Sequence, residues 1–157
     1  MRVGHGFDIH KFGKIYKPLI LGGVHIPYCK GVVSHSDGDV IIHSIIDSLL
    51  GASSLGDIGI LFPNNDIKYK NINSCILLQV VWNCIKKKYK IGNIDVTLFL
   101  EYPKISSYTN KICLCISNCL KCKTDVINIK SKTMEGLGEI GKKKGIASEA
   151  VSVLLEI

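Results

Sequence analysis

Residues 36–52 read SDGDVIIHSIIDSLLGA, and this segment leaves few folds open to the chain. Asp37 is a suitable capping residue, apolar residues recur after it at helical spacing, and Gly51 is a typical end point, so the segment predicts a helix. Its apolar residues are Val40, Ile41, Ile42, Ile45, Ile46, Leu49 and Leu50. A helix with so wide an apolar surface needs other elements to cover it.

The polar residues of this helix form one narrow stripe. Asp39, His43 and Asp47 follow one another at intervals of four and therefore lie on the same side of the helix. Such a stripe can face a functional site, or it can be the solvent-facing edge of an amphipathic helix. The helix by itself leaves both interpretations open.

The rest of the chain alternates between strand and helix patterns, without an evident linker or repeat. The expected elements are a strand at 1–10, a hairpin at 18–28 turning at Gly22 and Gly23, a polar loop at 63–73, a helix near 74–88, a strand at 93–102, a break at Pro103, a helix near 105–121, a strand at 125–133, and a closing segment at 145–157 that is either strand or helix. This order predicts one domain in which helices pack against a sheet.

Composition narrows the class of protein. The 157 residues are 46% hydrophobic and 21% charged, which is typical of one globular domain and argues against disorder. The net charge is +7, but the lysines are dispersed apart from the runs 86–88 and 142–144, so we expect no nucleic-acid partner. Seven cysteines, an odd number, without a recognisable secretion signal predict free thiols in a reducing cytoplasm. The apolar runs are too short and too interrupted to cross a membrane.

The segment GHGFDIH, residues 4–10, places two potential metal ligands in the first strand. Side chains alternate along a strand, so Asp8 and His10 project from the same side, beside Gly6. They could bind a divalent ion, or Asp8 could only orient a structural histidine. Together with His43 they would make a set of three ligands with an open fourth position, which is typical of catalytic zinc.

Polar residues near the start of the predicted helix and in two later turns are further candidates. His35 and Ser36 precede the helix, where unpaired backbone N–H groups and the helix dipole favour a phosphate. Asp57, Asn64 and Asp66 lie in predicted turns, where they could belong to a site or could only cap their own backbone.

The segment GLGEIG, residues 136–141, matches the G-x-G-x-x-G pattern of dinucleotide-binding folds. Only 16 residues follow it, too few for the helix, strand and acidic residue that such a unit requires. Thr133 and Glu135 come just before these glycines. We expect them to flank a turn where a phosphate can approach the backbone.

Four cysteines lie close together in the second half of the chain: Cys113, Cys115, Cys119 and Cys122. Their spacing matches no familiar set of metal ligands, and the last three fall on one helical face with Ile112 and Ile116. We interpret them as small buried hydrophobic residues.

Taken in order, the motifs of the chain resemble those of one enzyme family. They are GHGFDIH, LGG, IPY, HSDGDV, LLGA, LGDIG, FP, GN before DVT, PK, and EGLG followed by GIA. From residue 1 to about 153 the sequence resembles the 2-C-methyl-D-erythritol 2,4-cyclodiphosphate synthases of the non-mevalonate isoprenoid pathway. The resemblance implies an α+β fold in a single catalytic domain, residues 1–157, with a mixed four-stranded sheet covered by helices on one face. It also implies a homotrimer, with the sheets around the threefold axis and the active sites between subunits.

The same resemblance implies two metal ions and a cytidyl substrate. Asp8, His10 and His43 would bind Zn²⁺, and Glu135 would reach Mg²⁺ or Mn²⁺ as the second ion. The catalytic residues would be His35, which would hold and polarise a phosphate, and Thr133. The substrate-binding residues would be Asp8, His10, His35, Ser36, Asp57, Gly59, Phe62, Asp66, Leu100, Lys104, Ile105, Ser106, Lys132, Thr133, Glu135 and Lys142.

The implied reaction is a phosphoryl transfer within one molecule. The 2-phosphate of 4-diphosphocytidyl-2-C-methyl-D-erythritol 2-phosphate attacks its own β-phosphorus, closes a ring and expels CMP. The main obstacle is charge, because two unit negative charges about 4 Å apart repel by roughly 4 kcal/mol at an effective dielectric constant of about 20. Divalent cations offset this repulsion, and positioning of the two reacting groups can lower the barrier by about 7 to 11 kcal/mol.

The chain departs from the family pattern in two places. Asn64 stands where the family usually has an acidic residue, and residues 139–144 read EIGKKK where Phe-Thr-Gly-Arg-Gly-Glu is usual. Three copies of Lys142 and Lys144 around the axis would attract an anion such as a prenyl diphosphate. The alternative is a lysine run that only adds surface charge.

Two other functions are compatible with parts of the sequence. A zinc phosphohydrolase would use the same three ligands with a metal-bound water as the nucleophile. A basic nucleic-acid module would use the lysine runs, with or without a metal site formed by cysteines.

Overall fold

The computed structural model describes residues 1–13, 17–63 and 65–157. Its main sheet has four strands in the order β1-β6-β4-β5. Their bounds are Arg2–Lys11 for β1, Gly145–Glu156 for β6, Tyr89–Phe99 for β4 and Ile127–Lys132 for β5. β6 is antiparallel to both β1 and β4, whereas β4 and β5 are parallel, so the sheet is mixed as expected.

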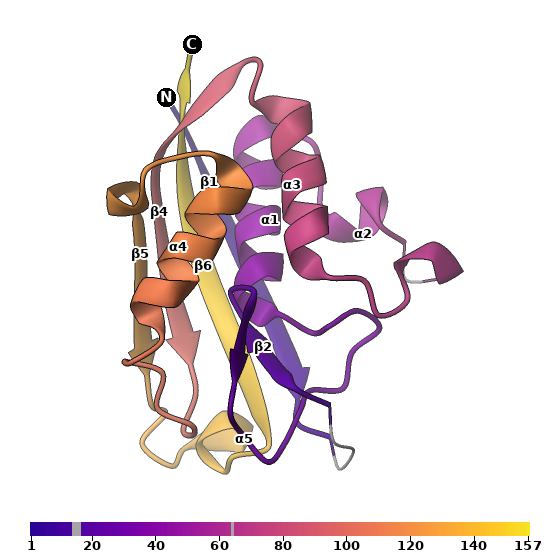
Figure 1. Ribbon diagram of the computed structural model, residues 1–157, viewed down its shortest axis with the longest axis vertical. Coiled ribbons are helices and arrows are strands. Elements are labelled where there is room, and N and C mark those ends of the chain that lie inside the picture. Colours follow the sequence, from indigo (N-terminus) through magenta and orange to yellow (C-terminus); the bar gives the residue numbers. More distant parts are fainter. Residues whose placement is uncertain (14–16, 64) are drawn as a thin grey trace.

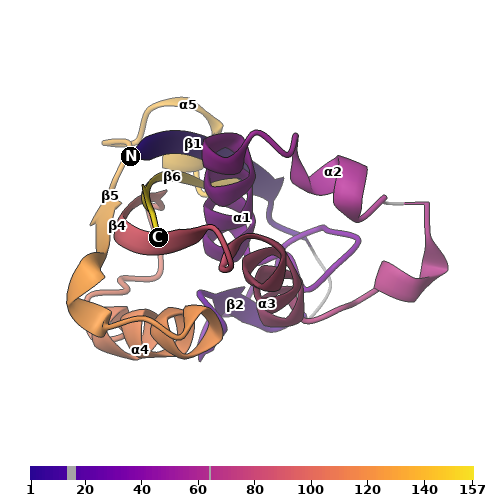
Figure 2. The ribbon, with the colours of Figure 1, turned by 90° about the horizontal axis from the view of Figure 1, so that it is seen from above.

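Three helices cover one face of this sheet (Figures 1 and 2). They are α1 (Val40–Ser53), α3 (Ser74–Ile85) and α4 (Thr109–Leu120). The smaller elements are the hairpin strands β2 (Leu19–Leu21) and β3 (Val24–Ile26), the short helices α2 (Ile58–Leu61) and α5 (Gly138–Gly141), and the 3-10 turns η1 (Ile67–Tyr69) and η2 (Thr124–Val126). Segregated helices on a mixed sheet make this an α+β fold.

The core lies between α1 and the sheet, where the wide apolar surface of α1 is covered. The side chains of α1 that have no exposed surface include Ile41, Ile42, Ile45, Ile46, Leu49 and Leu50. They belong to one continuous apolar cluster that also takes in residues of the hairpin, α3, α4 and the sheet. The described residues thus share a single core, as the sequence predicts for one domain.

Glycines and serines bring α1 unusually close to the sheet. A Cβ atom added at Gly4 would lie 1.9 Å from the backbone oxygen of Ser48, and one at Gly6 would lie 2.0 Å from that of Ser44. The hydroxyls of Ser44 and Ser148, on β6, are hydrogen-bonded at 2.8 Å. Because no side chain larger than hydrogen fits at these two glycines, the glycines of GHGFDIH set the distance between helix and strand.

The opposite face of the sheet carries exposed apolar side chains. On β1 the exposed fractions of Val3, Phe7 and Ile9 are 60%, 51% and 55%, and Val151 on the neighbouring β6 is 37% exposed. Together these four residues form an apolar patch, which we call the outer patch. The three long helices α1, α3 and α4 all lie on the other side of the sheet, and the short helix α5 lies at one end of the outer face (Figure 2).

The prediction that Asp37 caps α1 is wrong. The helix begins at Val40 with Asp39 as its N-cap, and the Asp39 carboxylate accepts hydrogen bonds from the backbone N–H groups of Ile42, Gly22 and Gly23. Asp39 therefore joins the start of α1 to the turn of the β2–β3 hairpin. A local pattern could not separate two aspartates two residues apart, because the choice depends on the distant hairpin.

Other boundaries differ by a few residues from the sequence prediction. α1 ends at Ser53 rather than at Gly51, α3 ends at Ile85, β4 begins four residues earlier at Tyr89, and α4 begins at Thr109. The ambiguous closing segment is β6, a strand with β1 on one side and β4 on the other. Within the described ranges, no helix has both the length and the apolar character needed to cross a bilayer.

Candidate functional site

Asp8, His10 and His43 come together at one point between β1 and α1. Asp8 Oδ2 lies 2.9 Å from His43 Nδ1 and 3.1 Å from His10 Nε2. The ligand atoms of the three residues all lie within 4.8 Å of one another, which is close enough for one ion to contact all of them. The structure confirms that the three residues predicted as metal ligands form such a group.

The local structure explains why these residues meet. Asp8 and His10 lie on the helix-facing side of β1, where they follow Gly4 and Gly6, the two glycines that let α1 approach. His43 lies in the first turn of α1, one turn after the N-cap Asp39. Because the hairpin turn holds Asp39, it also fixes the part of α1 that carries His43.

The hydrogen bonds around His43 leave a place for a cation. The Ser74 hydroxyl donates to Asp37, so it accepts from the His43 Nε2–H at 2.9 Å. A neutral His43 then turns its Nδ1 lone pair toward the oxygen of Asp8, and two acceptors 2.9 Å apart require a proton or a metal ion between them. The contact of Nε2 with Ser74 is the kind of outer interaction that orients a metal-binding histidine.

Charge in the group also fits a cation. Burial opposes ionisation of Asp8, but the close contacts with His10 and His43 outweigh it and hold the pKa of the carboxyl well below its usual range. Burial alone would lower the pKa of His43, yet Asp8 raises it above the usual value. His10 Nε2 is buried and has no hydrogen-bond partner among the described residues. An ionised carboxylate beside an unpartnered imidazole nitrogen suits a divalent ion with nitrogen and oxygen ligands.

A pocket of about 190 Å³ opens beside this group. The predicted site residues that line it are Asp8, His10, His35, Ser36, His43, Gly59 and Phe62. Tyr69, Ile72 and Leu77 complete much of its apolar wall. The pocket thus combines potential metal ligands with small polar groups and apolar surface, as small-molecule sites do.

Asp57 and Asp66, both predicted to contact substrate, do not line this pocket. Asp57 is the N-cap of α2 and accepts from the backbone N–H of Ile60, and Asp66 accepts from that of Lys68 in η1. Both side chains therefore cap their own backbone in this structure. This was the alternative that the sequence left open for turn residues.

The polar stripe of α1 does not face one site. Only His43 belongs to the ligand group, because Asp39 is fully buried against the hairpin turn and Asp47 accepts a hydrogen bond from the backbone N–H of Ile58 at 2.8 Å. Asp47 thereby holds the start of α2, which carries Gly59 of the pocket wall. The two aspartates position neighbouring segments.

A second pocket, of about 210 Å³, lies at the opposite edge of the sheet, where β4 and β5 end. Its lining includes six predicted substrate residues, Leu100, Lys104, Ile105, Ser106, Lys132 and Thr133. Glu101, which no sequence motif marked as a site residue, also lines it and accepts a hydrogen bond from the backbone N–H of Met134 at 2.6 Å. The two pockets share no lining residue.

The remaining predicted residues lie outside both pockets. Glu135 has a positive φ of 50° and accepts a hydrogen bond from the Thr133 hydroxyl at 2.7 Å, so it flanks the turn as expected. Lys142 is exposed, with Glu139 as the nearest acidic partner at 3.9 Å. Asn64 lies outside the described residues.

Sequence reasoning missed Ser74 and misassigned Asp37. The Asp37 carboxylate accepts from both the backbone N–H and the hydroxyl of Ser74, and so joins the segment before α1 to the start of α3. Ser74 in turn contacts His43. The available signal was a serine at the predicted start of a helix, which is too common a feature to suggest contact with a metal-binding residue.

Comparisons with known proteins agree with this arrangement. The model of the YgbB family matches residues 1–155. The chain belongs to the YgbB family. This YgbB-family chain is 52% identical to the 2-C-methyl-D-erythritol 2,4-cyclodiphosphate synthase of Buchnera aphidicola subsp. Schizaphis graminum, over 99% of the chain and 93% of that protein. It is 54% identical to the synthase of the same name from Clostridium kluyveri, over 98% of the chain and 94% of that protein.

Solved structures are also similar to the YgbB-family chain. The IspF of Plasmodium falciparum in a CDP complex matches with a TM-score of 0.86 at 44% identity, over 99% of this chain and 96% of that one. The bifunctional IspDF of Campylobacter jejuni matches with a TM-score of 0.95 at 39% identity. The chain covers 99% of its own length in that match but spans only 42% of the Campylobacter protein.

Proposed function

We propose that this protein is a 2-C-methyl-D-erythritol 2,4-cyclodiphosphate synthase, a lyase of isoprenoid precursor biosynthesis. It converts 4-diphosphocytidyl-2-C-methyl-D-erythritol 2-phosphate to the 2,4-cyclodiphosphate and CMP. The observation that carries the proposal is the Asp8–His10–His43 group beside a pocket, in a chain whose full-length relatives bear that name. Residues 1–157 act as one catalytic domain, and the seven free cysteines favour a cytoplasmic location.

Zn²⁺ fits the Asp8–His10–His43 group, with Asp8 Oδ2, His10 Nε2 and His43 Nδ1 as its ligands. When bound there, the ion supplies positive charge that polarises a phosphate and offsets repulsion between phosphates. The chain holds the ligands in place: the hairpin turn fixes Asp39 at the start of α1, and Ser74 orients the ring of His43.

The lining of the first pocket supports the assignment of its other residues. His35 lines the pocket and holds a phosphate beside the metal ligands. Ser36, whose hydroxyl lies 3.2 Å from His43 Nε2, contacts the erythritol. Gly59 and Phe62 bound the same space. Asp57 and Asp66 contribute through α2 and η1, whose backbones they cap next to the pocket.

The second pocket receives the cytidine diphosphate part of the substrate. Lys104, Lys132 and Thr133 offer cationic and hydroxyl groups there, with Leu100, Ile105 and Ser106 around them. The complex of the Plasmodium relative with CDP is consistent with such a site in this family. Glu135, adjacent to Thr133, binds the second divalent ion, Mg²⁺ or Mn²⁺, through its carboxylate.

The two pockets become one active site in a homotrimer. Asp8 and His10 belong to β1 at one edge of the sheet, whereas Lys132 belongs to β5 at the other edge. A ring of three subunits joins one surface of each chain to a different surface of the next, so it can bring opposite edges together. The outer patch supports the same assembly, because exposed apolar patches mark protein interfaces and this one would face the threefold axis.

The lysine run attracts an anion to the axis of this trimer. Lys142 and Lys144 both lie near Glu139, at 3.9 Å and 3.0 Å, so the acidic residue offsets part of their charge. The segment still has a net positive charge in each subunit. Native mass spectrometry with farnesyl diphosphate tests whether the lysine run binds an anion on the axis. One bound molecule per trimer supports this proposal. Absence of binding would mean that the lysine run only adds surface charge.

Phosphorus NMR of the reaction mixture is the direct test of the proposed function. With the cytidyl substrate and both metal ions, we expect the wild type to give the cyclic diphosphate and CMP. Asp8→Ala removes the carboxylate that lies between the two histidines, so its turnover and its bound zinc should both be lost. His25→Ala is the matched control, because this exposed histidine on β3 lies outside the site.

Two results would contradict the proposal. Release of inorganic phosphate in place of the cyclic product would indicate a phosphohydrolase. Equal turnover by the wild type and a correctly folded Asp8→Ala variant would show that the reaction does not depend on the ligand group. Circular dichroism of the variant establishes that it is folded.

A further inference from the structure

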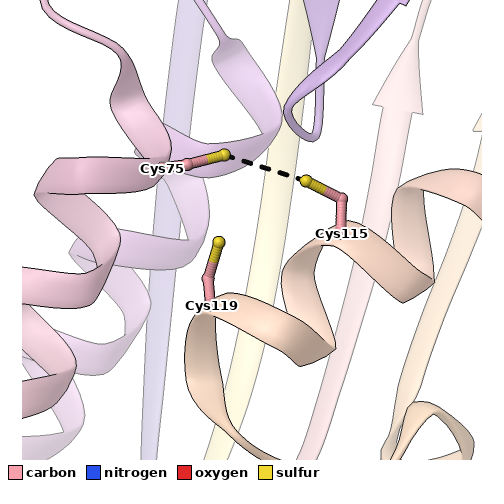
Figure 3. A group of neighbouring side chains, drawn as sticks. All are labelled: Cys75, Cys115 and Cys119. Carbon is pink, nitrogen blue, oxygen red and sulfur yellow. Dashed lines mark hydrogen bonds between the residues drawn. The ribbon is translucent and has the colours of Figure 1, made fainter.

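Three cysteines from two helices converge on the side of the molecule away from the outer patch. Cys75 lies in the first turn of α3, and Cys115 and Cys119 lie one turn apart in α4. Their sulfur atoms all lie within 4.8 Å of one another, and those of Cys75 and Cys115 are 3.9 Å apart. Figure 3 shows the three side chains directed into the same space between the helices.

This group corrects the sequence interpretation of the cysteines as small buried hydrophobic residues. Only Cys119 is buried, whereas Cys75 and Cys115 are partly exposed. Cys122 lies beyond the end of α4, and Cys113 is directed toward the backbone oxygen of Ile127 instead. Cys75 was missed because it precedes Cys115 by 40 residues, so no local spacing connects the two.

The separation of the sulfur atoms fits a shared metal ion. A disulfide bond needs about 2.05 Å between sulfurs, far less than the 3.9 Å found. In a tetrahedral zinc site with Zn–S bonds of about 2.3 Å, neighbouring sulfurs lie about 3.8 Å apart. The Cys75–Cys115 pair matches this spacing, and because Cys119 Sγ lies within 4.8 Å of both, the three sulfurs can occupy three corners of such a site after a small adjustment.

The surroundings of the group keep the sulfurs together. A Cβ atom added at Gly23 would lie 2.5 Å from the sulfur of Cys115 and 2.6 Å from that of Cys75, so the hairpin turn closes over both. Asp39 accepts a hydrogen bond from the backbone N–H of Gly23 and fixes this turn.

We propose that Cys75, Cys115 and Cys119 form a thiolate metal site, distinct from the Asp8–His10–His43 group, that binds a thiophilic ion such as Zn²⁺ and joins α3 to α4. Soft thiolate ligands select ions of this class. Three protein ligands leave a fourth position for water or an added thiol. Binding releases a proton from each cysteine that is still a thiol.

Metal binding at the three cysteines also restrains Ser74, the residue that precedes Cys75. Ser74 contacts His43 Nε2 and the Asp37 carboxylate, so the start of α3 contributes to both groups. An ion that fixes Cys75 restricts the movement of this turn. We therefore expect metal binding at the cysteines to stabilise the fold, with a measurable rise in melting temperature.

Cobalt titration distinguishes the two groups, because only thiolate ligands give intense sulfur-to-cobalt charge-transfer absorption. The reduced protein is freed of metal with a chelator and titrated with Co²⁺ and then with Zn²⁺. We expect the charge-transfer band in wild type and in Asp8→Ala. In Cys75→Ser and Cys115→Ser the band should be lost or the affinity lowered at least about tenfold. Cys113→Ser, a change on the same helix outside the group, should behave as wild type.

Alkylation provides a second measurement that does not depend on a substitution. Mass spectrometry of each cysteine should show that Zn²⁺ slows the reaction of Cys75, Cys115 and Cys119 with iodoacetamide. The exposed Cys84 on α3 should react at an unchanged rate. This comparison within one protein remains informative if a cysteine variant fails to fold.

Three outcomes would overturn the proposal. The first is the absence of a charge-transfer band in the wild type, and the second is a band that persists in both Cys75→Ser and Cys115→Ser. The third is a Cys75–Cys115 disulfide that forms on air oxidation in a protein that, when reduced, retains no Zn²⁺ at the cysteines. These experiments are independent of the Asp8→Ala test of the proposed function. That test measures product formation and the zinc bound at the Asp8–His10–His43 group.

Discussion

The two faces of β1 carry residues of very different kinds. The helix-facing side carries Gly4 and Gly6, then Asp8 and His10, whereas the other side carries the apolar side chains of the outer patch. The strand therefore separates two tasks by alternation alone. The inner face sets the distance to α1 and carries two potential metal ligands, and the outer face carries the exposed apolar side chains that we propose to form a subunit interface.

The order of residues along the inner face follows the path of α1. The glycines lie opposite the middle and end of the helix, where Ser44 and Ser48 approach most closely. Asp8 lies opposite the beginning of the helix, where His43 is found. Small residues thus occur where the helix must touch the strand, and larger polar residues occur where a pocket opens. Close packing at the glycines therefore creates the geometry of the ligand group.

The largest expected effect comes from filling the inner face at Gly6. We expect Gly6→Ala to lower the free energy of unfolding by about 3 kcal/mol, because its Cβ atom would overlap the backbone of α1. Gly51→Ala is the matched control, since its nearest neighbour would be 3.8 Å away and a helical alanine is favoured over glycine by about 0.5 to 1 kcal/mol. Chemical denaturation measures both. Equal stability of Gly6→Ala and the wild type would show that α1 can move away from β1 without cost.

The outer face is tested at Phe7. Phe7→Lys replaces an exposed aromatic side chain of the outer patch by a charge, so we expect the proposed trimer to dissociate, with about 2 kcal/mol lost for each ring that the proposed interface buries. Light scattering after size-exclusion chromatography gives the mass of the assembly. Ile67→Lys is the control, because Ile67 is equally apolar but lies in η1, away from the sheet. A wild-type assembly in the Phe7 variant would exclude the outer patch from the interface.

A smaller effect is expected where the inner face meets α3. Ser74→Ala removes the hydroxyl that accepts from His43 Nε2 and leaves all three ligands in place. We expect zinc affinity at the Asp8 group to fall by about 10-fold to 100-fold, as is usual when an outer partner of a metal ligand is lost. Competition with a zinc-binding dye measures the change. Ser53→Ala, a serine of α1 outside the group, should leave the affinity unaltered; an equal loss there would point to a general destabilisation of the fold.

The smallest effect expected is that of mild acid on the same site. Asp8 raises the pKa of His43, so a proton remains on the free imidazole at higher pH than usual and competes with the metal. Zinc affinity should therefore fall as the pH decreases from about 8 to about 7. The fall should be no more than about tenfold, because one proton that competes with the metal changes the affinity by at most about tenfold per pH unit. Asp8 contributes nothing to this dependence, because its lowered pKa keeps it ionised throughout. Isothermal titration measures the change, and an affinity that rises with acid would contradict the assignment.

Much of this fold could be predicted from short segments of sequence. The alternation of GHGFDIH predicted β1 and its shared face for Asp8 and His10, and the apolar repeat of residues 40–50 predicted α1. The pair Gly22 and Gly23 marked the hairpin turn. These predictions succeeded because periodicity and turn chemistry act between residues that are neighbours in the chain.

The errors occurred where a side chain meets a partner far away in the sequence. Asp37 and Asp39 are both good capping residues, but the distant glycine turn decides that Asp39 caps α1 and leaves Asp37 to hold Ser74 at the start of α3. Asp57 and Asp66 cap the short elements α2 and η1 through local hydrogen bonds, and their contact with substrate stays a prediction. For Asp37 and Asp39, a contact with a distant segment decides between two roles that are both locally possible.

Local sequence patterns were enough for most strands and helices, the faces that must be buried, and the family resemblance, but they left residues 145–157 open between strand and helix. The contacts of Asp37 with Ser74 across 37 residues, and of Cys75 with Cys115 across 40 residues, became visible only in the folded chain. The physical reason is that secondary structure is encoded in local spacing, whereas the distance between two helices depends on how their side chains pack together. The Asp8–His10–His43 group combines both, because spacing places two of its members and the close approach at Gly6 brings the third.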